Sequence, residues 1–422
     1  AFSLAFATTG IAQNNEGQDK VIDLGTQTTT ELRKTQAVST IYSDELDKNA
    51  TTSPYNAIYG LLPGLSVMQN TSWGTDKSRL NVRGRGSLNG DTPLFVVDGF
   101  ARPLEYINLS EIESISVLKD GAATALWGGR GANGVVLITT KRGIYNQKDI
   151  KVDYKFGLGL PVNQPEFADA YTYAKARNEA LRYDGLQPDM DEASFLSGGN
   201  SDLYPNVDWQ KEALRNHTTS HQLDITFRGG GKRLRYFSVL NYKNDMGLLN
   251  SKYTDYTDRY NSQMKKYFLN LRMNLDVDIT DATKLKLSML GMLRETKRPT
   301  TSEATLFEQI FNTPSAAFPV QTQNGFWGSN NVLKTNPIAN LADVGYYKLN
   351  QRMLQADLRL VQDLSVLTRG LSAELAIAYD NNATYQETAK KSFMYQTIEK
   401  GTDGEPIYTN YGNPNDELEI SN

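Results

Sequence analysis

Four short runs between residues 80 and 141 decide the fold of the first part of this chain. Residues 80–87 read LNVRGRGS, residues 93–99 read PLFVVDG, residues 112–120 read IESISVLKD and residues 128–141 read GGRGANGVVLITTK. Each apolar, β-branched run has the length of one short strand, and glycine-rich turns separate the runs. Asp98 and Gly99 form a turn signal, because glycine adopts a positive φ without a steric penalty. The pattern predicts several short strands that pack as one compact unit.

Helix signals lie between these strands. Ser110 and Glu113 have the spacing of a capping box, in which two side chains satisfy the free N–H groups at the start of a helix. Asp120 can cap another short helix that runs to Leu126. We therefore predict a small α+β domain over residues 37–145.

From residue 146 to residue 422 the chain changes to long segments in which apolar and polar residues alternate. In residues 269–279 every second residue is apolar, and the residues between them are asparagine, arginine or aspartate. A period of two indicates a strand with one apolar face and one polar face. Most of these segments have about the length that a tilted strand needs to cross a bilayer. The pattern recurs at residues 152–160, 221–228, 233–243, 284–294, 352–362 and 371–380.

The connections between these segments alternate between short and long. This order is expected of an outer-membrane β-barrel, in which every second turn lies on the periplasmic side, and it favours a barrel over a soluble sandwich or propeller. About seven strands are visible, whereas a closed bacterial barrel needs an even number, so we expect only part of a barrel here. The short connections are residues 229–232, 280–283 and 363–370, and the long ones are residues 161–220, 244–267, 295–351 and 381 onward.

Composition excludes several classes of function. The 422 residues include 44 lysines and arginines against 48 aspartates and glutamates, for a formal net charge of −4. That balance gives no electrostatic reason to expect nucleic acid as a partner. The absence of cysteine excludes disulfides, thiolate metal sites and thiol nucleophiles. No run of about 18 apolar residues occurs, so a helical membrane span is not expected.

The first residues have the composition of an export signal. Residues 1–12 are mainly apolar and end in a small-x-small pattern, after which the chain turns polar. We interpret them as the remnant of a cleaved signal peptide; a buried N-terminal strand is the alternative. Residues 13–36 are predicted to be a mobile tail with one apolar island at residues 21–24. Such an island can pair with the sheet edge of another protein, although a linker without a role is the simpler interpretation.

Arg83, Arg85 and Arg130 lie beside glycines, an arrangement that suits anion binding. No glycine-lysine-serine or glycine-lysine-threonine ending follows, so a nucleotide-binding loop is not supported. Pairing with acids on the wall of the barrel is the favoured role, and direct contact with a substrate is the alternative.

The remaining polar residues give no pattern of a metal site or a catalytic site. His217 and His221 are the only histidines, and a metal would need further ligands. Asp189, Asp191 and Glu192 resemble half of a calcium loop, but the glycine and the later glutamate are misplaced. No nucleophile has a base beside it. We expect a protein that is not an enzyme and that uses no cofactor and no metal.

Taken together, the runs between residues 62 and 141 resemble the plug domain of the SusC/RagA family of TonB-dependent outer-membrane transporters from Bacteroidetes. The matching pieces are LPGL at residues 62–65, VRG at 82–84, PLFVVDG at 93–99, IESI at 112–115, VLKD at 117–120 and RGANG at 130–134 with TTK at 139–141. They cover about a quarter of the chain. The resemblance implies that the plug motif, and with it the seating of the plug in the barrel, rests on Arg83, Gly84, Asp98, Gly99, Arg130, Gly131, Asn133 and Gly134.

The same resemblance implies a fold and a set of partners. The fold is mainly β, with the plug at residues 37–145 inside a barrel of about 22 strands that begins at residue 146. The partners are the inner-membrane TonB complex, a SusD-like surface lipoprotein that closes the barrel as a lid, and outer-membrane lipid, with no nucleic acid. The candidate TonB box, which would bind TonB by β-strand addition, is Val21, Ile22, Asp23 and Leu24.

The function that follows is import of an oligomeric nutrient across the outer membrane, with oligosaccharide as the first choice of substrate and oligopeptide as the second. The candidates for the side that faces the substrate are Trp73, Asn89, Asp91 and Arg102, because the plug topology would place their turns outward. An aromatic face such as that of Trp73 can stack on a sugar ring or on an apolar side chain. A surface β-protein that binds carbohydrate without transport is the alternative, and a soluble β-rich hydrolase is a more distant one.

Overall fold

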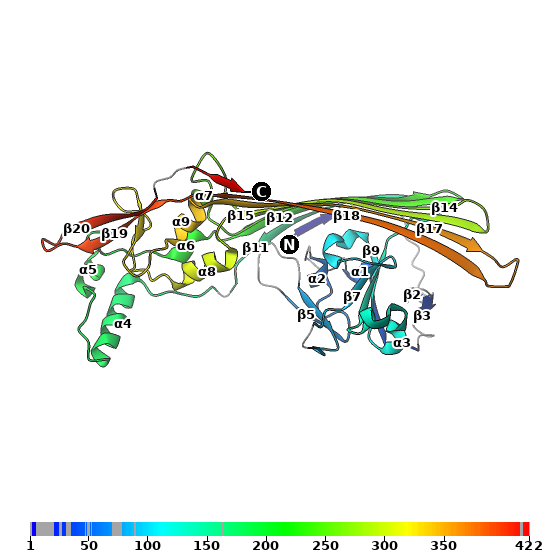
Figure 1. The fold of residues 1–422 in the computed structure, drawn as a ribbon, viewed down its shortest axis with the longest axis horizontal. Helices are drawn as coiled ribbons and strands as arrows, with labels where there is room; N and C mark the ends of the chain where they lie inside the picture. Colours follow the sequence, from blue (N-terminus) through cyan, green and yellow to red (C-terminus); the bar gives the residue numbers. More distant parts are fainter. Residues whose placement is uncertain are drawn as a thin grey trace.

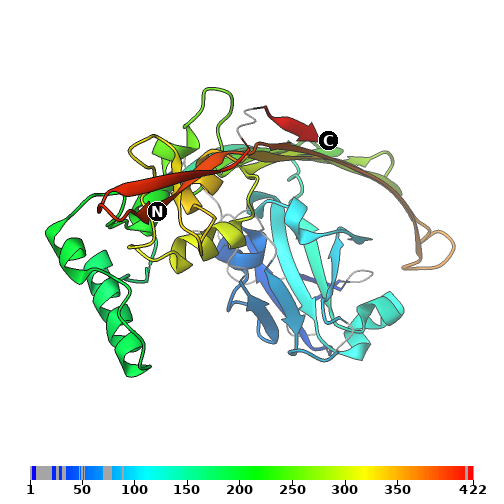
Figure 2. The same ribbon diagram turned by 60° about the vertical axis from the view of Figure 1, so that its left-hand side comes forward.

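The computed structural model describes residues 2–5, 21–24, 28–30, 35–46, 48, 51, 53–69, 78–87, 90–162, 164–413 and 417–421. Three bodies make up this part of the chain. A large curved sheet arches over a small N-terminal domain, and a cluster of helices and short strands lies at one end of the sheet (Figures 1 and 2). The N-terminal domain lies on the concave side of the sheet, so the sheet and the domain face each other over a long interface.

The N-terminal domain is built from two small sheets with short helical turns. The larger one has the order β4-β9-β10-β7-β8, in which β10 pairs parallel to β7 and antiparallel to β9. The strands are β4 (Val38–Tyr42), β7 (Leu94–Val97), β8 (Phe100–Ala101), β9 (Ile112–Leu118) and β10 (Val135–Thr140), with β5 (Leu65–Met68) and β6 (Arg79–Val82) as the second sheet. The helical elements are α1 (Ser43–Leu46), α2 (Pro54–Ala57), α3 (Gly121–Thr124), η1 (Leu104–Tyr106), η2 (Leu109–Glu111) and η3 (Ala125–Gly131).

Buried aliphatic side chains hold this domain together. β9 is paired on both edges, with β4 and β10, and almost all of its side chains are buried. Ile115 and Val117 on this strand belong to the main core with Ile41, Leu104 and Val136. Residues 112–118 read IESISVL, so the small polar side chains of Ser114 and Ser116 are buried along with the apolar ones.

The predicted capping box at Ser110 and Glu113 is wrong. The box is formed two residues earlier, at the start of η2, where the Asn108 side chain accepts a hydrogen bond from the backbone N–H of Ser110 and Glu111 reaches back to the N–H of Asn108. Glu113 instead belongs to β9. Asparagine is as good an N-cap residue as serine, so spacing alone could not decide between the two positions. The cap at Asp120 is confirmed, since its carboxylate accepts a hydrogen bond from the N–H of Ala123.

The large sheet consists of long consecutive antiparallel strands. Its order in the described part of the chain is β1-β11-β12-β13-β14-β15-β17-β18-β21, and closure into a barrel stays a prediction. β1 (Phe2–Ala5), from the segment interpreted as a signal remnant, pairs with β11, and β21 (Glu419–Ser421) pairs with the end of β18. The long strands are β11 (Lys148–Gly159), β12 (Thr218–Gly230), β13 (Leu234–Met246), β14 (Lys265–Asp278), β15 (Thr283–Pro299), β17 (Gly345–Asp363) and β18 (Ser372–Lys390).

The long connections form the cluster at the loop end of the sheet. Their core contains Trp209, Phe318 and Trp327, which come from two different connections. Tight turns lie at the other end of the strands, as the alternation of short and long connections predicted. No helix in the described ranges is both long enough and apolar enough to cross a membrane. The cluster contains α4 (Ala170–Tyr183), α5 (Glu192–Ser197), α6 (Trp209–Ala213), α7 (Ser251–Thr254), α8 (Glu303–Asn312), α9 (Pro337–Ala342), β16 (Trp327–Ser329), β19 (Met394–Lys400) and β20 (Pro406–Gly412).

Candidate functional site

The turn between β7 and β8 touches the large sheet through its backbone. Asp98 and Gly99 have φ values of 45° and 88°, which is the geometry of a two-residue hairpin turn. The Asp98 carboxylate accepts hydrogen bonds from the backbone N–H (3.0 Å) and the hydroxyl (2.6 Å) of Thr140, so the turn is fixed to β10. The Asp98 carbonyl accepts a hydrogen bond from Arg359 of β17. Glycine is needed here for the positive φ, and a Cβ at position 99 would also displace the Arg359 guanidinium from the Asp98 carbonyl.

Arg102 lies just after β8 and forms a buried ion-pair node with the large sheet. Its two Nη atoms donate to the Asp357 carboxylate of β17 at 2.6 and 2.5 Å, and its Nε lies 3.1 Å from both Asp380 oxygens on β18. The Arg102 side chain is 3% exposed and that of Asp357 is 5% exposed. This planar double contact is the one for which arginine is suited and lysine is not. Arg102, predicted to face the substrate, is therefore placed on the interface between domain and sheet.

Glu111 forms a second buried node on β14. Its carboxylate is fully buried and accepts hydrogen bonds from the Nε of Arg272 and the Nδ2 of Asn270. Burial raises the pKa of Glu111, and the charge of Arg272 acts against that rise. The Glu111 carboxylate also accepts the capping-box hydrogen bond from the N–H of Asn108 at the start of η2. This one residue therefore stabilises η2 and joins it to the sheet.

Contacts beside these two nodes extend the interface along the sheet. Arg142 donates to Asp276 at 2.7 Å and to the Ser288 hydroxyl at 2.9 Å. Asn274 donates to the Thr140 hydroxyl at 2.9 Å. A small apolar cluster also bridges the interface. It contains Tyr106 from η1 and Phe268, Met292 and Met353 from the sheet. These contacts are therefore mostly polar, and Arg142 is paired with an acid of the sheet.

Comparison with known proteins identifies this arrangement. Residues 30–135 match the family model of the TonB-dependent Receptor Plug Domain. The TonB-dependent receptor SusC of Bacteroides thetaiotaomicron is 30% identical over 283 residues, which cover 63% of this chain and 26% of that protein. The TonB-dependent receptor P26 of Formosa agariphila is 28% identical over 281 residues, 65% of this chain and 26% of that protein.

Solved structures show the same fold. The RagAB peptide importer in its closed-closed state matches with a TM-score of 0.68 at 19% identity, over 84% of this chain and 42% of that chain. The chain belongs to the SusC/RagA family of TonB-dependent receptors. It spans about a quarter of the length of the curated relatives that it matches. The N-terminal domain is thus the plug, and we call the concave face of the large sheet the wall.

The plug motif residues other than Asp98 and Gly99 make contacts inside the plug. Gly134 has a φ of 87°, and a Cβ there would lie 2.8 Å from the Val82 side chain, so this glycine lets β6 and β10 approach. The Asn133 side chain donates to the Gly90 carbonyl at 3.2 Å. Arg83 has a positive φ of 58°, next to Gly84 at 85°, and its N–H donates to the Gly64 carbonyl. A Cβ on Gly131 would lie 3.1 Å from the Thr124 carbonyl.

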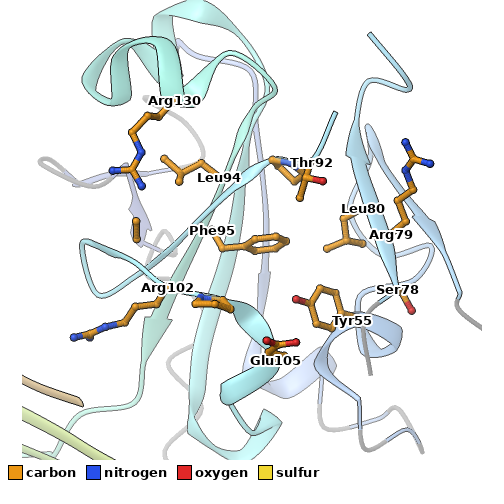
Figure 3. A pocket seen from close by; sticks show the side chains of 13 residues that line it. Tyr55, Ser78, Arg79, Leu80, Thr92, Leu94, Phe95, Arg102, Glu105 and Arg130 are labelled. Atoms are coloured by element: carbon orange, nitrogen blue, oxygen red, sulfur yellow. The ribbon is translucent and has the colours of Figure 1, made fainter. Parts of the chain in front are cut away.

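A cavity of about 540 Å³ lies between the two small sheets of the plug. Figure 3 shows the rings of Tyr55 and Phe95 in its centre beside Leu80 and Leu94, with the guanidinium groups of Arg79, Arg102 and Arg130 pointing away from that centre. Arg130 lines this cavity. The cavity thus has an apolar centre and a basic edge.

Asp91 is buried beside this cavity, and two arginines pair with its carboxylate. Arg79 donates to both of its oxygens, at 2.8 and 2.9 Å, and the Arg85 Nε lies 3.3 Å away. The hydrogen bond from Arg79 holds the pKa of Asp91 below its ordinary value. Asp91 was predicted to face the substrate and Arg85 to pair with the wall, whereas the structure pairs them with each other. Trp73 and Asn89, the other two substrate-facing predictions, lie outside the described residues.

The candidate TonB box lies on the plug, on the side away from the loop cluster (Figure 1). Residues 21–23 form β2 (Val21–Asp23), which pairs with β3 (Thr28–Thr30). Ile22 and Leu24 are buried, and they pack with plug residues that include Val38, Val96 and Leu137. The apolar island is therefore docked on the plug core through these two side chains.

The residues that resembled part of a metal site, for which no metal was expected, are engaged in protein contacts. Asp189 accepts hydrogen bonds from Arg177, and Asp191 caps α5. The His221 Nδ1 lies 2.7 Å from the Tyr154 hydroxyl. Across the described ranges, no group of three histidine, aspartate or glutamate side chains lies close enough together to hold a metal.

Proposed function

We propose that this chain is part of an outer-membrane transporter that imports an oligomeric nutrient in a TonB-dependent manner. Oligosaccharide is the first choice of cargo and oligopeptide the second, and a SusD-like lipoprotein acts as the lid. The plug serves as a gate on the wall. Energy delivered by TonB would loosen the contacts of Arg102 and Glu111 and so open a path for the cargo.

One observation supports this function most strongly, namely the reversed polarity of the large sheet. On β14 the residues that face away from the plug are apolar and exposed, with Leu271 at 43% and Met273 at 49%. The alternate residues Asn270, Arg272 and Asn274 are polar and buried under the plug. A soluble protein places its apolar face inward, whereas a strand in an outer-membrane barrel presents an apolar face to lipid and a polar face to the lumen. The plug therefore occupies the side that would be the lumen.

The position of the candidate TonB box supports the coupling to energy. Ile22 and Leu24 are docked on the plug, so a protein that captured β2 by strand addition would pull directly on the plug core. The choice of cargo follows the relatives, of which one is SusC and another is named a peptide importer.

The test uses the complete receptor in its native host. Deleting residues 19–25 is expected to abolish growth on the nutrient while leaving the amount of receptor in the outer membrane unchanged. A deletion of residues 14–18, which precede the box and contain no apolar side chain, is the control and should be tolerated. Unimpaired growth of the first variant would show that the box lies elsewhere, and recovery of the wild type in the soluble fraction would overturn the transport function.

A further inference from the structure

A row of lysines crosses three strands on the face of the large sheet that points away from the plug. The strand register places Lys265 of β14 opposite Lys297 of β15, and Lys297 opposite Lys348 of β17. Residues that are directly opposite project from the same face with their Cβ atoms about 5 Å apart. Like charges at that separation destabilise a sheet, so this row calls for an anionic partner.

The face on which the row lies follows from the contacts of the plug. On β14 and β15 the even-numbered residues touch the plug, as Arg272 and Arg294 do, so the odd-numbered lysines point away from it. On β17 the odd-numbered Asp357 touches the plug, so Lys348 points away as well. All three lysines therefore lie on the face that the proposed function turns toward the membrane.

The chain compensates these charges only in part. The Glu295 carboxylate lies 3.2 Å from the Lys348 Nζ. Glu387 stands opposite Lys348 but accepts a hydrogen bond from the Tyr346 hydroxyl at 2.5 Å. The Lys297 Nζ lies 5.3 Å from the centre of the Tyr346 ring, a contact that leaves its charge in place. Within the described ranges, neither Lys265 nor Lys297 takes part in an ion pair.

The residues next to the row show where it would lie in a membrane. The next row of outward-facing residues toward the tight turns contains Tyr267 and Tyr385. Tyrosine is typical of the surface region of a membrane. The following row pairs Leu269 with Leu293 and has the exposed Arg352 opposite Leu293, and from Leu271 and Leu354 onward the outward residues of β14 and β17 are apolar. In the other direction the strands pass into the long connections. The lysines thus lie at the boundary between an apolar band and the loop cluster.

The geometry points to a binding site for a phosphorylated lipid of the outer leaflet on Lys265, Lys297 and Lys348. The acyl chains would cover the apolar band, and the phosphate would lie among the three ammonium groups. Three lysines on strands about 4.8 Å apart span about 10 Å, which their flexible stems can close around one phosphate. This inference rests on the proposed placement of the sheet in the outer membrane.

The test measures lipid binding by the purified complete receptor in detergent. The probe is a synthetic phosphorylated lipid A analogue, with its dephosphorylated form and inorganic phosphate as comparisons. The variant replaces the three lysines together, Lys265→Gln, Lys297→Gln and Lys348→Gln. Lys232→Gln, in the exposed tight turn between β12 and β13, is the matched control at the far end of the strands.

We expect the triple variant to bind the phosphorylated lipid about 100-fold more weakly, at about 5-fold for each lysine, and the control to bind it like the wild type. Equal affinity of the triple variant and the wild type, or of the phosphorylated and dephosphorylated lipids, would overturn the inference. Equally tight binding of inorganic phosphate would show that the lipid is not the ligand. Growth on the nutrient is measured on the same variants. Transport by the wild type does not depend on the outcome of the lipid titration, so a failure of the lipid inference is distinguished from a failure of the transport function.

Discussion

Replacing Arg102 with alanine should loosen the plug from the wall. The Arg102 side chain is almost fully buried and, within the described part of the chain, is the cation that pairs with the Asp357 carboxylate, which is also buried. Removing one partner of a buried ion pair costs about 3–5 kcal/mol, because the other charge is left without compensation. Asp380 adds little to this cost, since its side chain is 46% exposed and water can solvate it. The docking equilibrium should therefore shift by a factor between about 100 and about 4,000.

Amide hydrogen exchange in the complete receptor would measure this shift. Peptides that cover residues 104–111 contain η1 and η2, which lie against the wall through Tyr106 and Glu111, so their amides are shielded from water while the plug is docked. We expect Arg102→Ala to speed their exchange by a large part of the predicted factor. Arg177→Ala is the control, because Arg177 pairs with Asp189 in the loop cluster and both side chains are about half exposed.

A neutral version of the same node distinguishes lost charge from lost packing. The triple variant Arg102→Met, Asp357→Asn and Asp380→Asn removes every charge and keeps similar volumes. Replacement of a whole buried charge group by neutral residues is often close to neutral in stability, so this variant should recover most of the protection. The reasoning is refuted if Arg102→Ala exchanges like the wild type, or if the triple variant is as exposed as Arg102→Ala.

Two further predictions concern the plug itself. Gly134→Ala should destabilise the plug by about 2–4 kcal/mol, because the positive φ costs alanine about 1 kcal/mol or more and its Cβ overlaps Val82. Gly86→Ala should have little effect, because no atom lies within 4 Å of a Cβ at that position. Urea unfolding of both variants measures the difference. The lowered pKa of Asp91 means that its pair with Arg79 stabilises the plug above the ordinary carboxyl pKa and is lost as the pH falls through the depressed value. The urea midpoint should fall between about pH 5 and about pH 3, and the same fall in Arg79→Met would contradict this assignment.

Secondary-structure elements of the plug and of the large sheet could be predicted from the sequence. The period of two in residues 269–279 predicted the two faces of β14, because successive side chains of a strand point to opposite sides. The turn at Asp98 and Gly99 was predicted from the glycine, and the structure has a positive φ at both positions. Local rules of this kind depend on neighbouring residues only, so a single sequence is sufficient for them.

The pairing across the interface could not be predicted in the same way. Arg102 and Asp357 are separated by 255 positions, and Glu111 and Arg272 by 161. Alternation marks Asp357 and Arg272 as polar residues of the inner face, but it does not say which residue of the plug each one meets. The prediction for Arg85 had the right kind of partner, an acid, and the wrong place, since Asp91 lies six positions away within the plug.

The wall holds the plug unequally along its width. Toward β14, β17 and β18, the contacts are the buried nodes of Glu111 and Arg102. Toward β11 and β12, a cavity of about 300 Å³ separates plug and wall, and it is lined by charges of both signs that include Lys151 and Asp153. Nearby, Arg228 lies 3.6 Å from Glu113 and donates from its Nε to the Arg142 carbonyl at 2.7 Å, and the side chains of Arg228 and Glu113 are partly exposed.

This difference decides where the cost of separating the plug lies. Charges that already line a wet cavity lose little when the surfaces part, because water replaces the partner. The carboxylates of Glu111 and Asp357 have no such access, so each is left buried and unpaired until the plug has moved far enough for water to enter. The resistance to a pull on the N-terminal segment is therefore concentrated on the buried ion pairs of β14 and β17, whereas the partly exposed pair of Arg228 on β12 with Glu113 separates at a lower cost.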